Sequence, residues 1–156
     1  MRLTQKPNCQ VRGPAPQPCA SCPYRRDVPS GIWAAEEYAK LPAYDADTPF
    51  QPPHLFLCHQ TSADDPRARV CAGWVGCHGS DLLALRLAAA RGIIDGAELD
   101  VNRTTTTTSV PLFTSGAAAA DHGLRDIDTP GIKACEIMNK IAERRSDTTT
   151  LGDSTA

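Results

Sequence analysis

The stretch Cys71-Ala72-Gly73-Trp74-Val75-Gly76-Cys77-His78 places two thiols and an imidazole within eight residues, spaced by small residues around one tryptophan. Upstream, Cys19 and Cys22 form a Cys-x-x-Cys pair, and Cys58 ends a short apolar run. A Cys-x-x-Cys turn lets two sulfurs converge on one ion. Gly73 and Gly76 are expected to let the backbone turn tightly and approach those sulfurs closely, and Trp74 is expected to shield the site from water. We therefore predict one metal site, assembled from three separated segments.

The candidate metal ligands are five thiols and one imidazole: Cys19, Cys22, Cys58, Cys71, Cys77 and His78. The first four are the best placed, and Cys77 is an alternate for Cys71. His78 is equally well explained as a turn or core histidine. Of the other two cysteines, we expect Cys9 to be a free thiol on a tail and Cys135 to be a core thiol on an amphipathic helix.

Four thiolates at irregular spacing fit a closed structural Zn2+ site, and they also fit a [4Fe–4S] or [2Fe–2S] cluster. Zinc is favoured because small domains commonly use such a staple. The cysteine surplus and the proline directly after Cys22 favour a cluster, and a chain without metal is the third alternative. A thioredoxin-like redox pair would need a strand before Cys19, where the sequence is rich in proline.

The length of 156 residues fits one domain. We expect an irregular or disordered arm over residues 1–18, a metal-binding domain over 19–145 and a polar tail over 146–156. The net charge of −2 gives no basic footprint for nucleic acid.

The beginning of the chain has no apolar segment of the secretory type. The longest apolar run of the whole sequence, residues 82–90, is too short to span a bilayer. These features predict a cytoplasmic protein without a membrane segment. In a reducing cytosol, clustered cysteines are metal ligands or redox groups more often than disulfides.

Hydrophobic periodicity predicts helices over residues 31–41, 81–91 and 131–145, and a short one over 116–122. Ser30 is the expected cap of the first helix, and Ser115 is the expected cap of the short one. Residues 54–59 and 67–70 are expected to be short strands. The predicted fold class is a small, irregular α+β domain, with a metal-stapled core of about three helices and one or two short strands.

Enzyme signatures are incomplete. Pro18-Cys19-Ala-Ser-Cys22 matches one half of the zinc-deaminase motif, but no His-x-Glu occurs in the chain. A Ser-His-Asp signature, a P-loop and a dinucleotide fingerprint are also absent from the sequence. A metal-dependent enzyme would need an open coordination position, best placed near His59 or His78.

Three motifs resemble an uncharacterised family of actinobacteria and their phages: Cys19-x-x-Cys22-Pro-Tyr-Arg-Arg-Asp, Cys58-His-Gln, and Cys71-Ala-Gly-Trp-Val-Gly-Cys77-His-Gly. The resemblance spans about residues 19–135 and implies a bacterial or phage intracellular setting, with the shared cysteines as a binding site. It implies no reaction. The Cys-x5-Cys pair beside a tryptophan is also similar to that of the WhiB-like iron–sulfur regulators, although the pairs occur in a different order.

We therefore expect a small intracellular metal-binding protein, a non-enzymatic adaptor or regulator rather than an enzyme. Its expected partner is an unidentified protein or nucleic acid, recognised by a surface around Arg25, Arg26 and Trp33, and no small-molecule substrate is inferred. The alternatives are an iron–sulfur protein in redox sensing or transcriptional regulation, and a metal-dependent enzyme.

Overall fold

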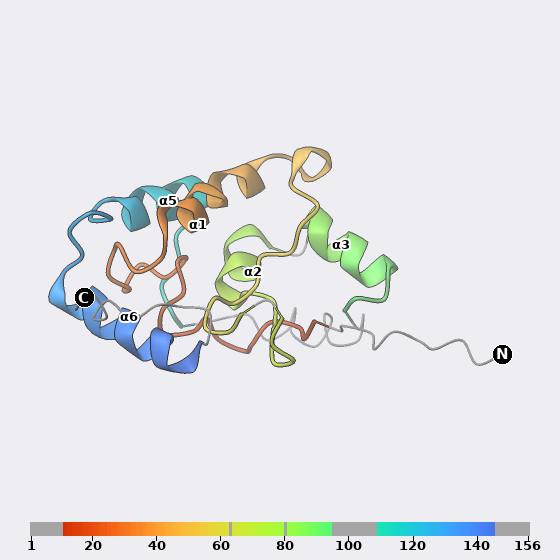
Figure 1. The fold of residues 1–156 in the computed structure, drawn as a ribbon. Coiled ribbons are helices and arrows are strands. Elements are labelled where there is room, and N and C mark those ends of the chain that lie inside the picture. The colour runs from red at the N-terminus through yellow and green to blue at the C-terminus, as the bar shows by residue number, and fades with distance from the viewer. Residues whose placement is uncertain (1–10, 63, 80, 95–108, 146–156) are drawn as a thin grey trace.

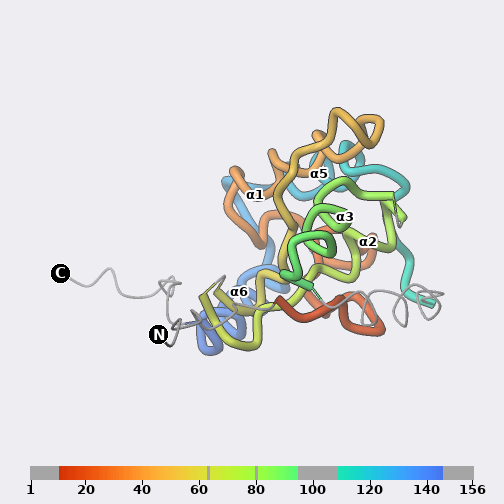
Figure 2. The backbone as a smooth tube through the Cα atoms, turned by 90° about the vertical axis from the view of Figure 1, so that its right-hand side faces the viewer, coloured from red at the N-terminus to blue at the C-terminus, as the bar shows by residue number. Residues whose placement is uncertain are grey.

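A computed structural model describes residues 11–62, 64–79, 81–94 and 109–145. The regular structure in these residues is helical, with five α-helices and two 3₁₀ helices: α1 (Ala35–Ala39), η1 (Leu41–Asp45), η2 (Thr48–Phe50), α2 (Ala72–His78), α3 (Leu83–Ala90), α5 (Gly116–Leu124) and α6 (Ile132–Arg144). Figure 1 shows α1 and α5 together on one side of the molecule and α6 on the opposite side, with α2 between them. The perpendicular view in Figure 2 gives the same arrangement.

The β part of the predicted fold class is wrong, because the described residues contain no sheet. The segments expected as strands meet in one isolated antiparallel bridge, between Leu57 and Val70. A longer ladder cannot form because α2 begins at Ala72, directly after the pairing, and carries the chain away. Two more isolated bridges join Arg12 to Arg69 and Arg25 to Leu112.

Three predicted helices are confirmed as α3, α5 and α6. The hydroxyl of Ser115 accepts a hydrogen bond from the amide of Ala118 (3.1 Å) and so caps α5, as expected. The helix predicted over 31–41 is shorter, since its expected cap, Ser30, instead donates to the carboxylate of Asp126. Residues 72–78, expected to turn around two glycines, form the helix α2.

The contact between α1 and α5 is close because Gly123 has no side chain. A Cβ atom there would lie 2.1 Å from the ring of Tyr38, so only glycine allows this packing. The carboxylate of Asp45, at the end of η1, accepts hydrogen bonds from the amides of Gly116 and Ala117 (2.6 and 2.9 Å). Asp45 thereby supplies partners for the first amides of α5.

Aromatic rings from several segments fill the centre of the molecule. Tyr24 and Trp74 are fully buried, and Tyr44 and Phe56 nearly so. Tyr44 packs edge-on against Trp74, with ring centroids 5.2 Å apart, and Tyr24 packs edge-on against Phe56 at 6.0 Å. Trp74 belongs to α2, so its packing in this aromatic core anchors the helix that follows Cys71.

Both ends of the described chain are attached to the segments that carry cysteines. Arg12 exchanges backbone hydrogen bonds with Ala68 and Val70, although it belongs to the segment expected to be an arm; residues 1–10 and 146–156 lie outside the described residues. At the other end, Arg144 donates to the side chain of Gln60, and Arg145 to the carbonyl of His59. No helix in the described ranges is both long and apolar enough to cross a membrane.

Candidate metal centre

Backbone hydrogen bonds bring the three cysteine segments together. The amide of Cys22 donates to the carbonyl of Cys19 (3.1 Å), which closes the Cys-x-x-Cys turn. The other two segments pair antiparallel: the amide of Cys58 donates to Arg69 and the amide of Cys71 donates to Phe56, both at 2.9 Å. A pairing of only a few residues is thus enough to hold Cys58 and Cys71 near each other.

Four thiols form a contiguous group, which we call the cysteine group: Cys19, Cys22, Cys58 and Cys71. The Sγ atoms of Cys22 and Cys71 lie 3.6 Å apart, and both side chains are buried. The thiol of Cys19 interacts with those of both Cys22 and Cys58, so it connects the two pairs. These are the four cysteines that the sequence places best for metal binding.

Crowding and burial favour the neutral form of Cys22 and Cys58. The pKa of Cys58 is raised by the thiol of Cys19 and by burial. For Cys22, the hydrogen bond with Cys19 lowers the pKa, but Cys71 and burial outweigh it and leave the pKa well above its usual value. Several thiolates in so small a space need a compensating positive charge, which a cation would supply if one were bound.

Hydrogen bonds from outside the group hold the Cys-x-x-Cys turn. The indole N–H of Trp33 donates to the carbonyl of Ser21 at 2.9 Å, and the side-chain amide of Gln60 donates to the Ser21 hydroxyl at 3.2 Å. The guanidinium of Arg25 donates to the carbonyl of Cys19 at 3.4 Å and pairs with Asp27. Sequence reasoning missed the roles of Ser21 and Gln60, although Ser21 lies inside the motif and Gln60 two residues after Cys58.

Helix α2 approaches the cysteine group through Gly73. A Cβ atom at this position would lie 2.2 Å from the Sγ of Cys22 and 2.9 Å from the Cβ of Tyr24. The absence of a side chain therefore lets the Cys22 thiol lie directly against the helix. The sequence predicted this role for Gly73, although it predicted a turn rather than a helix.

Among the described residues, neither Cys77 nor His78 is hydrogen-bonded to a thiol of the cysteine group. Cys77 lies six residues beyond Cys71 along α2, or about 9 Å at ~1.5 Å per residue. Burial and the carboxylate of Asp45 raise the pKa of Cys77 to about 12. His78 is a core histidine: its Nε2 lies 3.1 Å from the hydroxyl of Tyr24, and its Nδ1 lies 3.7 Å from Asp45.

Trp33 contacts two of the cysteine segments. Besides its bond to the Cys-x-x-Cys turn, its ring packs edge-on against His59, the residue after Cys58, with centroids 5.2 Å apart. Trp74, expected to shield the sulfurs, packs on Tyr44, and its buried indole N–H has no hydrogen-bond partner among the residues that the structure describes.

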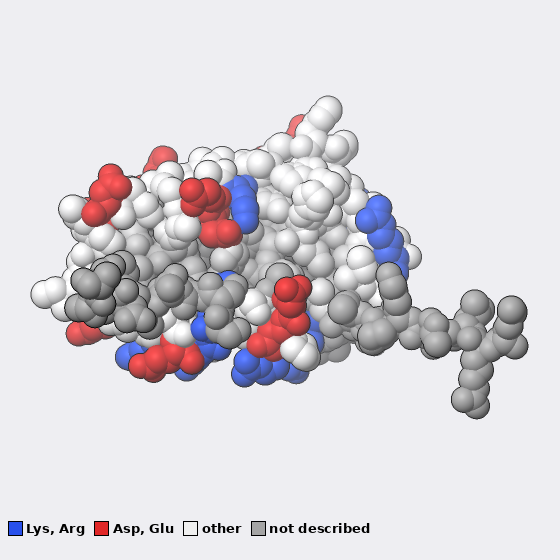
Figure 3. Space-filling model, in the orientation of Figure 1, with Lys and Arg blue, Asp and Glu red and all other residues white. Residues whose placement is uncertain are grey.

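The surface expected at Arg25, Arg26 and Trp33 does not contain Trp33 as an exposed side chain. Trp33 is only 9% exposed, and Arg25 is engaged with Asp27 and the turn carbonyls. Arg26 remains exposed. On the face drawn in Figure 3, acidic and basic side chains are interspersed rather than gathered by sign.

Within the residues that the structure describes, no group of three or more His, Cys, Asp or Glu side chains is already arranged to hold a metal ion. The finding that stands is the proximity of four thiols. Binding of a metal by them remains a proposal.

Comparison with known proteins identifies the family. Residues 14–145 match the family of unknown function DUF6283, and the chain belongs to this family. The match covers all six candidate ligands. No curated protein and no solved structure matches the chain.

Proposed function

We propose that this member of DUF6283 binds one structural zinc ion through the thiolates of Cys19, Cys22, Cys58 and Cys71. The observation that carries the proposal is the convergence of these four thiols from three segments that are far apart in the sequence. Such convergence without a metal or disulfide is unfavourable, because each ordered loop costs conformational entropy.

The separation of the two closest sulfurs supports one shared ion. Thiolates at about 2.3 Å from a zinc ion, in tetrahedral arrangement, lie roughly 3.8 Å from one another. The Sγ atoms of Cys22 and Cys71 are 3.6 Å apart. A disulfide requires about 2.05 Å.

The composition of the site supports a structural ion rather than a catalytic one. Four protein thiolates fill a tetrahedral coordination shell, whereas catalytic zinc sites keep one position for water or substrate. Neither candidate for an additional ligand stands free, because His59 pairs with Glu37 and His78 pairs with Tyr24. We therefore propose a non-enzymatic adaptor or regulator, whose zinc holds a folded surface for a protein or nucleic-acid partner.

Metal analysis of the isolated protein tests this proposal. The protein is purified without added metal, and its zinc and iron are measured by mass spectrometry together with the visible spectrum. We expect a colourless protein with about one zinc per chain. The variants Cys22→Ser and Cys71→Ser should lose it, while the matched controls Cys77→Ser and Cys135→Ser should keep it.

Two results would overturn the zinc proposal. A coloured protein that contains iron and sulfide would assign the four thiolates to an iron–sulfur cluster. A metal-free protein whose intact mass is lower by two hydrogens would contradict the zinc proposal if the bond joins Cys22 to Cys71, because these thiols would then form a disulfide. Peptide mapping without reduction distinguishes a disulfide between Cys22 and Cys71 from free thiols.

A further inference from the structure

The four thiols of the cysteine group differ in how far they are exposed. Cys22 and Cys71 are only 1% and 2% exposed, whereas Cys19 and Cys58 are half-buried. The thiols of Cys19 and Cys58 are also hydrogen-bonded to each other. The cysteine group therefore consists of an inner pair, Cys22 and Cys71, and an outer pair, Cys19 and Cys58.

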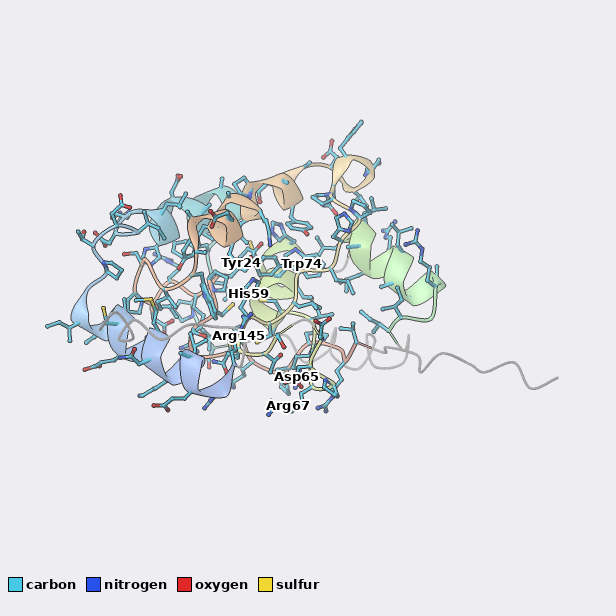
Figure 4. All side chains as sticks on the ribbon, viewed as in Figure 1. Tyr24, His59, Asp65, Arg67, Trp74 and Arg145 are labelled. Atoms are coloured by element: carbon cyan, nitrogen blue, oxygen red, sulfur yellow. The ribbon has the colours of Figure 1, made fainter. Side chains whose placement is uncertain are left out.

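A pocket of about 620 Å³ opens beside the outer pair. Its walls come from α1, η1, residues 52–61 and the residue that follows α6, and of the four thiol-bearing residues Cys58 lines it. Figure 4 shows His59, the residue after Cys58, beside Arg145 between α1 and α6. A pocket of this volume admits small solutes, so they can reach the outer pair while the inner pair stays covered.

Access and a neighbouring thiol are the two positional requirements of a reversible cysteine oxidation site. Peroxide attacks accessible thiolates, and a second thiol within reach converts the first product into a disulfide. The outer pair meets both requirements. Zinc coordinates thiolates rather than thiols, so a bound ion keeps Cys58 in its reactive form although Cys19 and burial raise its pKa. The inference that follows therefore rests on the proposed zinc site.

We propose that Cys58 is a site of oxidation by hydrogen peroxide and that Cys19 is its resolving thiol. The Cys58 thiolate attacks one peroxide oxygen, the O–O bond breaks, and hydroxide leaves, so that Cys58 becomes a sulfenic acid. The Cys19 thiolate then attacks the Cys58 sulfur and displaces a second hydroxide, which forms a disulfide. The two thiolates lose two electrons, and two protons from water convert both hydroxides to water. Cys22 and Cys71 stay reduced, but two thiolates no longer close a tetrahedral site, and zinc is released.

Addition of stoichiometric hydrogen peroxide to the zinc-loaded protein tests this inference. The zinc content is measured before the addition, zinc release is followed with a chromogenic indicator, and the products are mapped as peptides without reduction. We expect release of about one zinc per chain together with a disulfide between Cys19 and Cys58. Cys22 and Cys71 should still react with an alkylating agent after denaturation. A dithiol reductant with added zinc should restore the original mass and metal content.

Two tryptophan substitutions locate the approach of the peroxide without changing a thiol. Ala43 is exposed on η1 and lines the pocket, so Ala43→Trp should narrow the opening and slow zinc release and disulfide formation by the same factor. Ala90→Trp makes the same change at an exposed position on α3, outside the pocket lining, and should leave both rates at the wild-type value. Equal rates in wild type and both variants would overturn the pocket as the route.

The outcomes separate this inference from the zinc proposal on which it rests. A protein that contains no zinc before oxidation would overturn both. A zinc-loaded protein that keeps its metal in peroxide would overturn the oxidation site alone. So would one that releases zinc through a disulfide between Cys22 and Cys71, or through a sulfinic acid that the dithiol reductant does not reverse.

Discussion

Gly73 and Cys22 are in direct contact, such that a Cβ atom on residue 73 would lie 2.2 Å from the Cys22 Sγ atom. That distance is far below van der Waals contact, and both residues are buried. Helix α2 and the Cys-x-x-Cys turn therefore pack against each other with no room for a side chain between them. The position of one proposed zinc ligand depends on the absence of a side chain on a different segment.

Gly73→Ala should consequently disturb the cysteine group. The added methyl must displace the Cys22 thiol or push α2 away, and overpacking of this kind costs typically about 1–3 kcal/mol. We expect a lower thermal midpoint and a reduced zinc content in the purified protein. Gly131→Ala is the matched control, since a Cβ atom there meets nothing within 4 Å. Equal effects of the two substitutions would contradict the contact.

The two tryptophans provide a second comparison. Trp33→Phe removes the donor that satisfies the Ser21 carbonyl, and a buried acceptor without a partner costs about 1–3 kcal/mol. Because that carbonyl lies between Cys19 and Cys22, zinc should also be released faster to a competing chelator. Release rates are followed with a chromogenic zinc indicator.

Trp74→Phe serves as the control, because within the described part of the chain the indole N–H of Trp74 has no hydrogen-bond partner to lose. It should lower stability through lost packing against Tyr44 and leave the rate of zinc release close to wild type. The reverse order, with zinc release faster in Trp74→Phe, would restore Trp74 as the residue that shields the sulfurs.

The sequence was sufficient to predict which cysteines lie together, because they belong to short motifs with restricted geometry. It also predicted α3, α5 and α6, whose apolar residues recur at helical spacing. Residues 54–59 and 67–70 have strand-like composition, but their pairing depends on where the chain turns next, which composition does not encode. Likewise, α2 contains two glycines that local propensity disfavours in a helix, and its burial against Tyr24 and Cys22 outweighs that preference.

The neighbours of the cysteine group were harder to predict. Ser21 and Gln60 have no distinctive spacing, and their hydrogen bond joins residues 39 positions apart. The role of His78 was left open for the same reason. Its neighbours, Tyr24 and Asp45, are 54 and 33 positions away, and only the folded chain shows that Tyr24 is hydrogen-bonded to the imidazole and that Asp45 lies near it.

Removal of the metal should unfold the protein if zinc is a staple. The described part of the chain has short helices, no sheet and a modest core, and a closed thiolate site supplies on the order of 10 kcal/mol on metal binding. Incubation with a chelator should therefore abolish the cooperative thermal transition seen in the near-ultraviolet circular dichroism. Readdition of zinc under reducing conditions should restore it. A chelated, reduced wild type that keeps its full transition would contradict a structural role.

The buried imidazole of His78 predicts how stability depends on pH. Burial lowers the pKa of His78 below its ordinary value of 6.5, and the nearby carboxylate of Asp45 opposes this only in part. The unfolded chain therefore binds a proton more readily than the folded chain at this residue. Its contribution to stability is complete above about pH 6.5 and declines as the pH falls through that value toward the lower folded pKa.

His78→Gln should reduce this pH dependence while leaving zinc content unchanged, because glutamine cannot titrate and His78 is outside the cysteine group. The measurement is the urea midpoint at several values between about pH 7.5 and pH 5.5, where the unfolded imidazole becomes protonated. His54→Gln replaces an exposed histidine and is the control, expected to retain the slope of the wild type. Loss of zinc in His78→Gln, with the Tyr24→Phe variant keeping its metal, would instead make His78 a ligand.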